Sequence, residues 1–345
     1  MAEAIATPAR IDLDDWRRRA LALESILGEV IVGQSEALRL AVIAVFARGH
    51  VLLEGDVGVG KTTLLRALAR AVGGAYERLE GTVDLLPADL VYHAWVDEGG
   101  RPRVDPGPVV RHGEALAVLF FNEINRARPQ VHSLLLRVMA ERSASAFQRD
   151  VSLPHVLVFA DRNRLEREET FDLPSALRDR FLFEILVEAP TYQPLRRSLM
   201  RDTRYHDADA LIADALPQPL LDYRALETMA AAIQVEVTAS DTLVDYALAL
   251  CAGIAQPDSV DVGLEDHAGQ IVRAGVSPRG MSLLLRAARV ESWLQGRPSV
   301  LPIDVARVFH AAVAHRLVFA PVLELRRAEL ASRLTAAVLG KVAAP

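Results

Sequence analysis

The first 190 residues alternate between short apolar runs and stretches in which apolar side chains recur with helical spacing. The apolar runs are rich in β-branched and aromatic residues, as expected of strands that are buried on both faces. Strands that alternate with helices form a largely parallel sheet with helices on both of its faces. The sequence therefore predicts an α/β core with five parallel strands, at residues 51–53, 76–79, 118–121, 156–159 and 181–187.

From residue 223 onward the pattern is helical alone, with apolar residues such as Leu226, Met229 and Ile233 spaced three or four positions apart. A polar stretch with several prolines separates this part from the core. We therefore predict an N-terminal helical segment, an α/β core, a connection and an all-helical domain, at residues 1–27, 28–190, 191–222 and 223–345.

Two segments of the core have the pattern of β-hairpins. Residues 92–104 contain two short strand-like runs on either side of Gly99 and Gly100, a dipeptide that favours a tight turn. Residues 143–152 predict a second hairpin.

A phosphate-binding motif follows the first predicted strand. Residues 55–62 match the pattern G-x-x-x-x-G-K-[ST], whose glycines let backbone N–H groups point at phosphate while the next helix offers its positive end. In this motif Lys61 meets the β- and γ-phosphates and the Thr62 hydroxyl holds Mg²⁺. The sequence therefore predicts a site for ATP and Mg²⁺ formed by Gly55, Asp56, Val57, Gly58, Val59, Gly60, Lys61, Thr62 and Thr63.

A polar pair ends the third predicted strand. Asn122 and Glu123 follow the apolar run 118–121, and a parallel strand delivers such residues to the crevice at its carboxyl end. Beside a bound triphosphate, Glu123 would polarise the attacking water and Asn122 would contact the shell of Mg²⁺. We therefore expect Glu123 to be catalytic and Asn122, together with Thr62, to belong to the metal site.

Composition narrows the class of protein. The chain has 345 residues, of which 51% are apolar and 24% charged, as is ordinary for a globular protein of two domains. A net charge of −6 argues against nucleic acid as the main partner, and no apolar window is long enough for a membrane span. The single cysteine, Cys251, and the lack of a signal-peptide pattern predict a buried thiol in a cytoplasmic protein.

Several motifs together resemble the MoxR family of AAA+ ATPases. They occur in the family's order and cover roughly residues 28 to 320. They are the adenine-packing segment (31–34), the helix-2 insert region (82–90 and 106–109), the second nucleotide motif (122–127), the segment with the sensor-1 asparagine and the arginine finger (160–181), and the sensor-2 motif (277–279).

The resemblance implies a P-loop AAA+ core followed by an all-α lid domain. It implies that Asn163 holds the attacking water or the γ-phosphate, that Arg180 reaches a neighbour's nucleotide, and that Arg279 reaches the γ-phosphate from the lid. Val32 and Gly33 would contact adenine. It also implies an ATPase that forms a homo-hexamer and acts on a protein with a von Willebrand factor A domain, with maturation or metal-cofactor insertion as the task.

Two places depart from the family pattern. Asn122 stands where relatives usually have Asp, and an amide brings no negative charge to the shell of Mg²⁺. Asp161 and Arg162 precede Asn163, where relatives tend to have uncharged residues. A nucleotide-gated binding module with little hydrolysis therefore stays open, and a large gain in turnover in Asn122→Asp would indicate it. A phosphoryl transferase and a DNA-translocating machine also stay open, although the helical lid and the acidic balance argue against them.

Overall fold

The computed structural model describes residues 12–146, 149–163, 170–256 and 271–345. At its centre is a five-stranded sheet with the order β2-β5-β8-β1-β9, in which all neighbouring strands run parallel. Each run predicted as a strand falls on one of these five, so the predicted α/β class is confirmed. The strands are β1 (His50–Glu54), β2 (Ala75–Glu80), β5 (Leu116–Asn122), β8 (Leu157–Arg162) and β9 (Phe181–Leu186).

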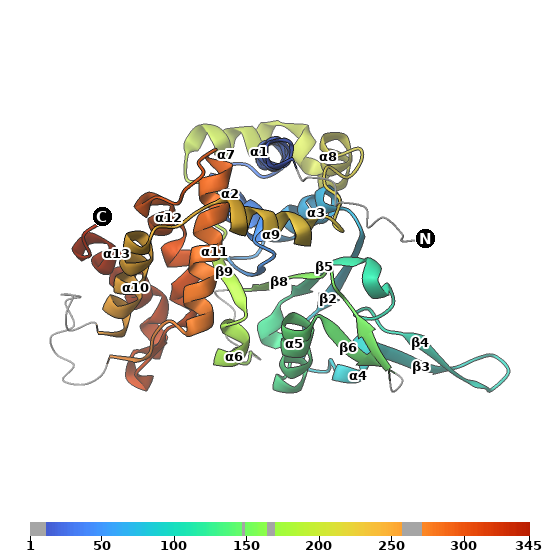
Figure 1. The fold of residues 1–345 in the computed structure, drawn as a ribbon. Coiled ribbons are helices and arrows are strands. Elements are labelled where there is room, and N and C mark those ends of the chain that lie inside the picture. Colours follow the sequence, from blue (N-terminus) through green and yellow to red (C-terminus); the bar gives the residue numbers. More distant parts are fainter. Residues whose placement is uncertain (1–11, 147–148, 164–169, 257–270) are drawn as a thin grey trace, which may run out of the picture.

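Helices cover both faces of the sheet (Figure 1). Because alternate residues of a strand point to opposite faces, Phe120 and Phe159 join one hydrophobic core whereas Phe121 and Ala160 join the other. The first core includes α1 (Leu13–Val30), α2 (Ser35–Phe46) and α3 (Lys61–Val72), and the second includes α4 (Pro87–Val91) and α5 (Pro129–Glu141).

Both predicted hairpins are confirmed. β3 (Tyr92–Val96) and β4 (Pro102–Pro106) pair antiparallel around a turn in which Gly100 has a φ of 75°, and this hairpin projects from the body of the molecule (Figure 1). β6 (Ser143–Ala146) and β7 (Arg149–Ser152) form the second hairpin. Short elements in the loops of the core are the 3-10 turns η1 (Gly113–Ala115) and η2 (Ile124–Arg126) and the one-turn helix α6 (Ser175–Arg178).

The chain after β9 is mainly helical over its described residues. α9 contacts both α2 and α11, so it bridges the core and the helical domain, and the exact domain boundaries stay a prediction. The α-helices are α7 (Gln193–Arg201), α8 (Ala208–Ala215), α9 (Leu226–Glu236), α10 (Asp241–Ala255), α11 (Pro278–Leu294), α12 (Pro302–Val313) and α13 (Arg327–Lys341). The remaining elements are β10 (Val272–Ala274), β11 (Val318–Phe319), η3 (Thr203–His206), η5 (Ala314–Arg316) and η6 (Pro321–Arg326).

Buried contacts hold the helical domain against the core. Arg39 of α2 forms a 2.7 Å ion pair with Glu291 of α11, and both side chains are buried. Nearby, the rings of Phe46 and Trp293 pack with their centroids 5.1 Å apart. Because a buried charge is costly without its partner, the pair resists separation of the two parts.

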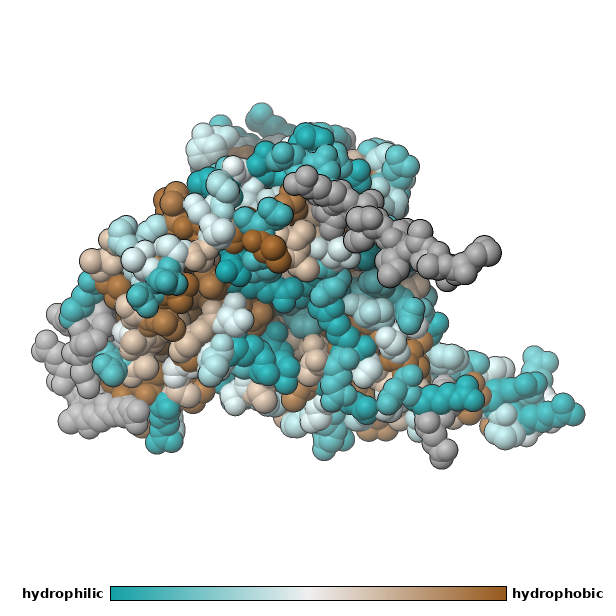
Figure 2. Space-filling view, in the orientation of Figure 1, coloured by the Kyte–Doolittle hydropathy of each residue, from teal (hydrophilic) through white to brown (hydrophobic). Residues whose placement is uncertain are grey.

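The surface differs between the two parts. Apolar residues gather over the region of α10 and α11, whereas the β3–β4 hairpin is mostly hydrophilic (Figure 2). Among the helices that the structure describes, none has both the length and the apolar character needed to cross a membrane.

Candidate functional site

The loop after β1 has the backbone conformation that its glycines predict. Gly58 and Gly60 have φ angles of 82° and 97°, in the left-handed region that glycine adopts readily. A side chain at Gly55 would put its Cβ 2.2 Å from the carbonyl oxygen of Val187, so this position has room only for glycine. The loop leads directly into α3. It therefore lies at the positive end of a helix dipole, which is an arrangement that binds phosphate.

Lys61 is buried at the start of α3 and faces the loop. Its Nζ donates hydrogen bonds to the carbonyl oxygens of Gly55 at 2.6 Å and Asp56 at 3.0 Å. It also lies 3.6 Å from Oδ2 of Asp161 at the end of β8. The ammonium group is therefore held where the loop curls, at the position from which a P-loop lysine reaches phosphate.

The segment predicted to pack against adenine lies against this loop. The Gln34 side chain donates a 2.8 Å hydrogen bond to the carbonyl oxygen of Val59. Ile31 approaches the last glycine of the loop, and Val32 and Gly33 lie between these two contacts, with Gly33 at a φ of 78°. The structure thus brings the predicted adenine and phosphate segments together.

Glu123 follows β5 in a strained conformation. Its φ is 52°, and the left-handed region costs a residue other than glycine on the order of 1 kcal/mol or more. Its backbone N–H donates to Oδ1 of Asp161 at 2.6 Å, and its carboxylate accepts a 3.1 Å hydrogen bond from Arg126. The side-chain amide of Asn122 donates to Glu80 on β2. Strained backbone conformations of this kind are common at functional sites, and Glu123 is the predicted catalytic residue.

Asp161 is a site residue whose role the sequence did not reveal. Its side chain is buried, and burial raises the pKa of its carboxyl, while the N–H of Glu123 and the charge of Lys61 lower that pKa. The available signal was an acidic residue at the end of an otherwise apolar strand. The register of β8 between β1 and β5 then brings this residue to the phosphate loop.

Asn163 directly follows β8, at the same edge of the sheet as Glu123. Arg162 directly precedes Asn163 in the sequence, but its charge is paired with other residues. Its guanidinium forms ion pairs with Glu54, at 2.9 Å, and with Glu184. Burial raises the pKa of Glu184 to about 7. Arg162 therefore belongs to a partly buried ion-pair cluster that joins β1, β8 and β9. Arg164 and Arg167, the next two arginines in the sequence, lie outside the described residues.

Arg180 and Arg279 come together around Asp179. Arg279 donates to Oδ2 of Asp179 at 2.9 Å, and the Ser277 hydroxyl donates to its Oδ1 at 2.6 Å. Burial lowers the pKa of Arg180, and the charge of Arg279 lowers it further. The buried Arg316 donates to the same carboxylate at 3.2 Å. The start of α11 is thus fixed to the residues that precede β9.

This arginine cluster lies at the opposite edge of the sheet from the phosphate loop. β9 runs parallel to β1, with Phe181 beside His50 and Leu186 beside Glu54. Arg180 therefore precedes the end of β9 that is far from the loop, and five residues of strand, roughly 15 Å, separate the two levels. Within one chain the Arg279 side chain pairs with Asp179 at the amino end of β9, and its contact with a γ-phosphate stays a prediction.

The oxygen donors at the carboxyl edge fit Mg²⁺. In nucleotide sites this ion takes one or two protein oxygens together with phosphates and waters. Thr62 lies in the first turn of α3 and Asn122 ends β5, so a hydroxyl and an amide oxygen are available beside the loop. Among the described residues, no group of three or more His, Cys, Asp and Glu could hold a metal ion by itself.

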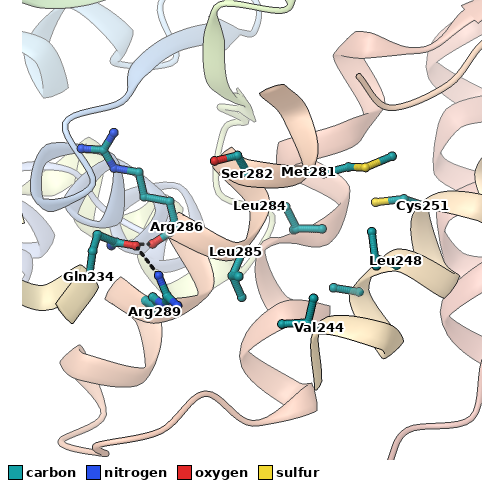
Figure 3. Close-up of a pocket in the computed structure, with 11 residues that line it drawn as sticks. Gln234, Val244, Leu248, Cys251, Met281, Ser282, Leu284, Leu285, Arg286 and Arg289 are labelled. Carbon is teal, nitrogen blue, oxygen red and sulfur yellow. Dashed lines mark hydrogen bonds between the residues drawn. The ribbon is translucent and has the colours of Figure 1, made fainter. Parts of the chain in front are cut away.

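A separate apolar cavity of about 450 Å³ lies between α9, α10 and α11 (Figure 3). Val244, Leu248 and Leu285 line it on one side, and Gln234 is hydrogen-bonded to Arg289 at the other end, at 3.5 Å. Cys251 also lines it, and burial raises the pKa of this thiol to about 11, in agreement with the predicted unreactive cysteine. The residues that line the cavity come from α9, α10 and α11, and none comes from the phosphate loop.

Family models match both parts of the chain. Residues 50–183 match the ATPase family associated with various cellular activities (AAA), and residues 264–336 match the AAA lid domain. The match to the first covers the phosphate loop, Glu123 and Arg180.

Named relatives are similar over nearly the whole length. Protein MoxR of Methylorubrum extorquens is 52% identical over 98% of both chains, and Protein MoxR of Paracoccus denitrificans is 52% identical over 97% of this chain and 98% of its own. Chaperone MoxR1 of Mycobacterium tuberculosis is 35% identical over 84% of this chain and 73% of its own. A solved structure of an ATPase candidate from Cytophaga hutchinsonii superimposes with a TM-score of 0.80 at 27% identity, over 96% of this chain and 97% of its own.

Proposed function

The chain belongs to the MoxR family of AAA+ ATPases, and on that basis we propose that it hydrolyses ATP at sites completed by two neighbouring subunits. The separation of the two halves of the predicted site supports this proposal. The phosphate loop follows the carboxyl edge of the sheet, whereas Arg180 and Arg279 lie at the amino edge. In a closed ring of identical chains, each subunit would offer its arginines to the nucleotide of the next.

The chemistry proposed is attack of water on the γ-phosphate, with cleavage of its bond to the β-phosphate oxygen and release of ADP and phosphate. Glu123 polarises the water and takes up its proton, and Asn163 holds the water or the γ-phosphate in line. Lys61 contacts the β- and γ-phosphates. Arg180 and Arg279 of the adjacent copy stabilise the negative charge that develops, a contribution worth several orders of magnitude in rate.

The nucleotide would span the carboxyl edge of one chain. Val32 and Gly33 would contact adenine. Thr62 and Asn122 would hold Mg²⁺, in part through its water molecules. When bound, this ion would neutralise part of the negative charge on the phosphates.

The free energy of ATP hydrolysis would be used for mechanical work on a protein. The name of the Mycobacterium tuberculosis relative, a chaperone, supports a role in remodelling or maturation. We propose a homo-hexameric ring, a client with a von Willebrand factor A domain, and metal-cofactor insertion as a candidate task. The single cysteine suits work in a reducing compartment such as the cytoplasm.

The decisive experiment is Mg²⁺-dependent ATP hydrolysis measured over a wide range of protein concentration. Native protein should gain specific activity as concentration rises, because assembly completes the sites. Glu123→Gln should lose that activity while it still binds ATP. Activity that is independent of concentration would contradict shared sites. ATP binding without hydrolysis in both proteins would instead favour the nucleotide-gated binding module. The uncharged Asn122 is the observation on which that alternative is based.

A further inference from the structure

Asn122 and Asp161 lie side by side at the carboxyl edge of the sheet. They end the neighbouring strands β5 and β8, whose register pairs Phe121 with Ala160 one residue earlier. On each strand the residue two positions earlier, Phe120 or Phe159, points into the core beneath α3. Since side chains alternate along a strand, Asn122 and Asp161 both point to the face that carries α3 and the phosphate loop.

Asp161 makes the contacts expected of a site carboxylate. Only 3% of the residue is exposed. One of its oxygens lies 3.6 Å from Nζ of Lys61, and the other accepts the N–H of Glu123 at 2.6 Å. One carboxylate therefore touches both the lysine of the phosphate loop and the backbone of the glutamate that is expected to activate water. A buried charge in such a place is costly unless cations and donors surround it.

Glu80 is the other carboxylate beside Asn122, and it is a weaker candidate for the same role. It accepts a hydrogen bond from the Asn122 amide, but half of its side chain is exposed and it pairs with Arg78 at 3.0 Å. Water and Arg78 therefore already screen its charge. Glu80 serves well as a control, because it touches Asn122 without lying in the buried part of the site.

We propose that Asp161 supplies, from β8, the carboxylate that the second nucleotide motif lacks at Asn122 on β5. Its negative charge faces the side on which Lys61 and Mg²⁺-ATP meet, and its hydrogen bond to the N–H of Glu123 holds that residue in its left-handed conformation. The site thus keeps one carboxylate, which comes from β8 instead of the neighbouring β5. Asn122 therefore does not have to weaken hydrolysis. This inference rests on the proposed ATPase function and identifies a further positioning residue within it.

The test moves the carboxylate from position 161 back to position 122. Five proteins are compared with the native chain: Asp161→Asn, Asn122→Asp, the double exchange Asn122→Asp/Asp161→Asn, Asp161→Ala and the control Glu80→Gln. For each, the affinity for a fluorescent ATP analogue is measured with Mg²⁺ and with EDTA, alongside kcat and KM for ATP and the melting temperature. An asparagine at 161 can still accept the N–H of Glu123, so Asp161→Asn removes charge while Asp161→Ala also removes the hydrogen bond.

Asp161→Asn should lose about tenfold or more of the affinity that Mg²⁺ adds, because a buried charge partner is removed. The double exchange should recover most of that loss. Asp161→Ala should lower kcat further than Asp161→Asn, because Glu123 is no longer held. Glu80→Gln should stay within about twofold of native, as expected for an exposed ion pair. Asn122→Asp alone should gain no more than about threefold in kcat, because two adjacent carboxylates repel.

Three results would overturn the inference. One is native Mg²⁺ dependence in a folded Asp161→Asn. Another is a gain of tenfold or more in Asn122→Asp, since that would show that the native site lacks a charge. The third is a folded double exchange in which Mg²⁺ adds no more affinity for the ATP analogue than it does in Asp161→Asn. If Asp161→Asn does not fold, the double exchange and Asn122→Asp are each compared with native protein instead. If every protein binds Mg²⁺-ATP but none hydrolyses it, the ATPase proposal fails while the Mg²⁺ dependence of affinity still tests Asp161.

Discussion

The two edges of the central sheet are built for opposite charges. At the carboxyl edge, glycines with positive φ, a helix N-terminus and the buried Lys61 converge on a site for phosphate. At the amino edge, Arg180 and Arg279 gather around the single carboxylate of Asp179. The phosphate loop thus lies at one edge, whereas Arg180 and Arg279 lie at the other. If the proposed function holds, a complete site would need two copies of the chain.

The way each edge holds its charges also differs. At the carboxyl edge, burial raises the pKa of the Asp161 carboxyl, whereas the N–H of Glu123 and the charge of Lys61 lower it. At the amino edge, burial lowers the pKa of Arg180, and the charge of Arg279 lowers that pKa further. With the buried Arg316, three arginines surround the one carboxylate of Asp179, and such an excess of positive charge favours the approach of an anion. The nucleotide phosphates of a neighbouring copy would be such an anion.

We predict the largest effect for two variants, each of which disables one edge of the sheet. Lys61→Ala and Arg180→Ala should each lose activity by about 10³-fold or more, because one disables the nucleotide site and the other removes a trans-acting cation. Mixed in equal amounts before assembly, they should recover about a quarter of native activity, because one interface in four would pair an intact loop with an intact arginine.

The control for this mixture is the double variant Lys61→Ala/Arg180→Ala mixed in equal amounts with native protein, which should also leave about a quarter of the activity of all-native protein, because one interface in four then joins two native copies. ATP turnover after mixing is the measurement. Failure of the two single variants to restore activity, although light scattering shows mixed assemblies, would mean that the edges do not meet between subunits.

A smaller effect is expected when the amino edge loses its anchor. Asp179→Asn should lower the free energy of unfolding by about 3 kcal/mol, because the buried Arg316 then loses its carboxylate partner. Denaturant unfolding measures this loss. Asp150→Asn is the control: its 3.3 Å ion pair with Arg137 is exposed, so it should change the same quantity by less than about 0.5 kcal/mol. An equal loss in the two variants would refute the distinction.

Acid should expose a further difference between the edges, through His50 at the start of β1. Burial lowers the pKa of His50 from 6.5 to about 3, so below pH 6.5 the unfolded chain binds a proton that the folded chain excludes. This part of the stability is present above pH 6.5 and is lost as pH falls towards 3. Between pH 7.5 and 5.5 it amounts to about 1.4 kcal/mol for this one group.

The measurement is the free energy of unfolding of native protein and of His50→Asn at both pH values. The asparagine can still accept the N–H of Val158, which bonds to Nδ1 of His50 at 3.0 Å. The variant should therefore lose less stability on acidification than native protein does, by roughly that 1.4 kcal/mol. Exposed His93→Asn should leave the pH dependence as it is. Parallel curves for native protein and His50→Asn would contradict the lowered pKa.

The smallest effect concerns the carboxyl edge. Arg126→Ala removes the 3.1 Å ion pair with Glu123, in which both side chains are partly exposed, so the free energy of unfolding should change by less than about 1 kcal/mol. Denaturant unfolding again measures it. A much larger loss would mean that Arg126 has a structural role that its exposure does not suggest.

Much of the fold could be predicted from local pattern. The alternation of apolar runs and helices specified the five parallel strands, and the glycines at 99 and 100 specified a hairpin turn. The phosphate loop was also local, since the positive φ angles of Gly58 and Gly60 follow from the motif itself. Such features depend on residues that are close in sequence, so composition and spacing are enough to indicate them.

The rest depended on register and docking. The sequence indicated that Asn122 lacks a charge, but only the pairing of β5 with β8 brings Asp161 beside it and Lys61 opposite. In the same way, the sensor-2 resemblance named Arg279, whereas the docking of α11 on the residues before β9 decided which edge it serves.

By itself, therefore, the sequence determined the class of fold, the phosphate loop and the family to which the chain belongs. Only the tertiary structure decided which charged residues share an edge, that Asp161 faces Lys61, and that Arg180 and Arg279 lie far from the loop of their own chain. The physical reason is that strand order, register and helix docking come from contacts between residues that are distant in sequence, which no local pattern records.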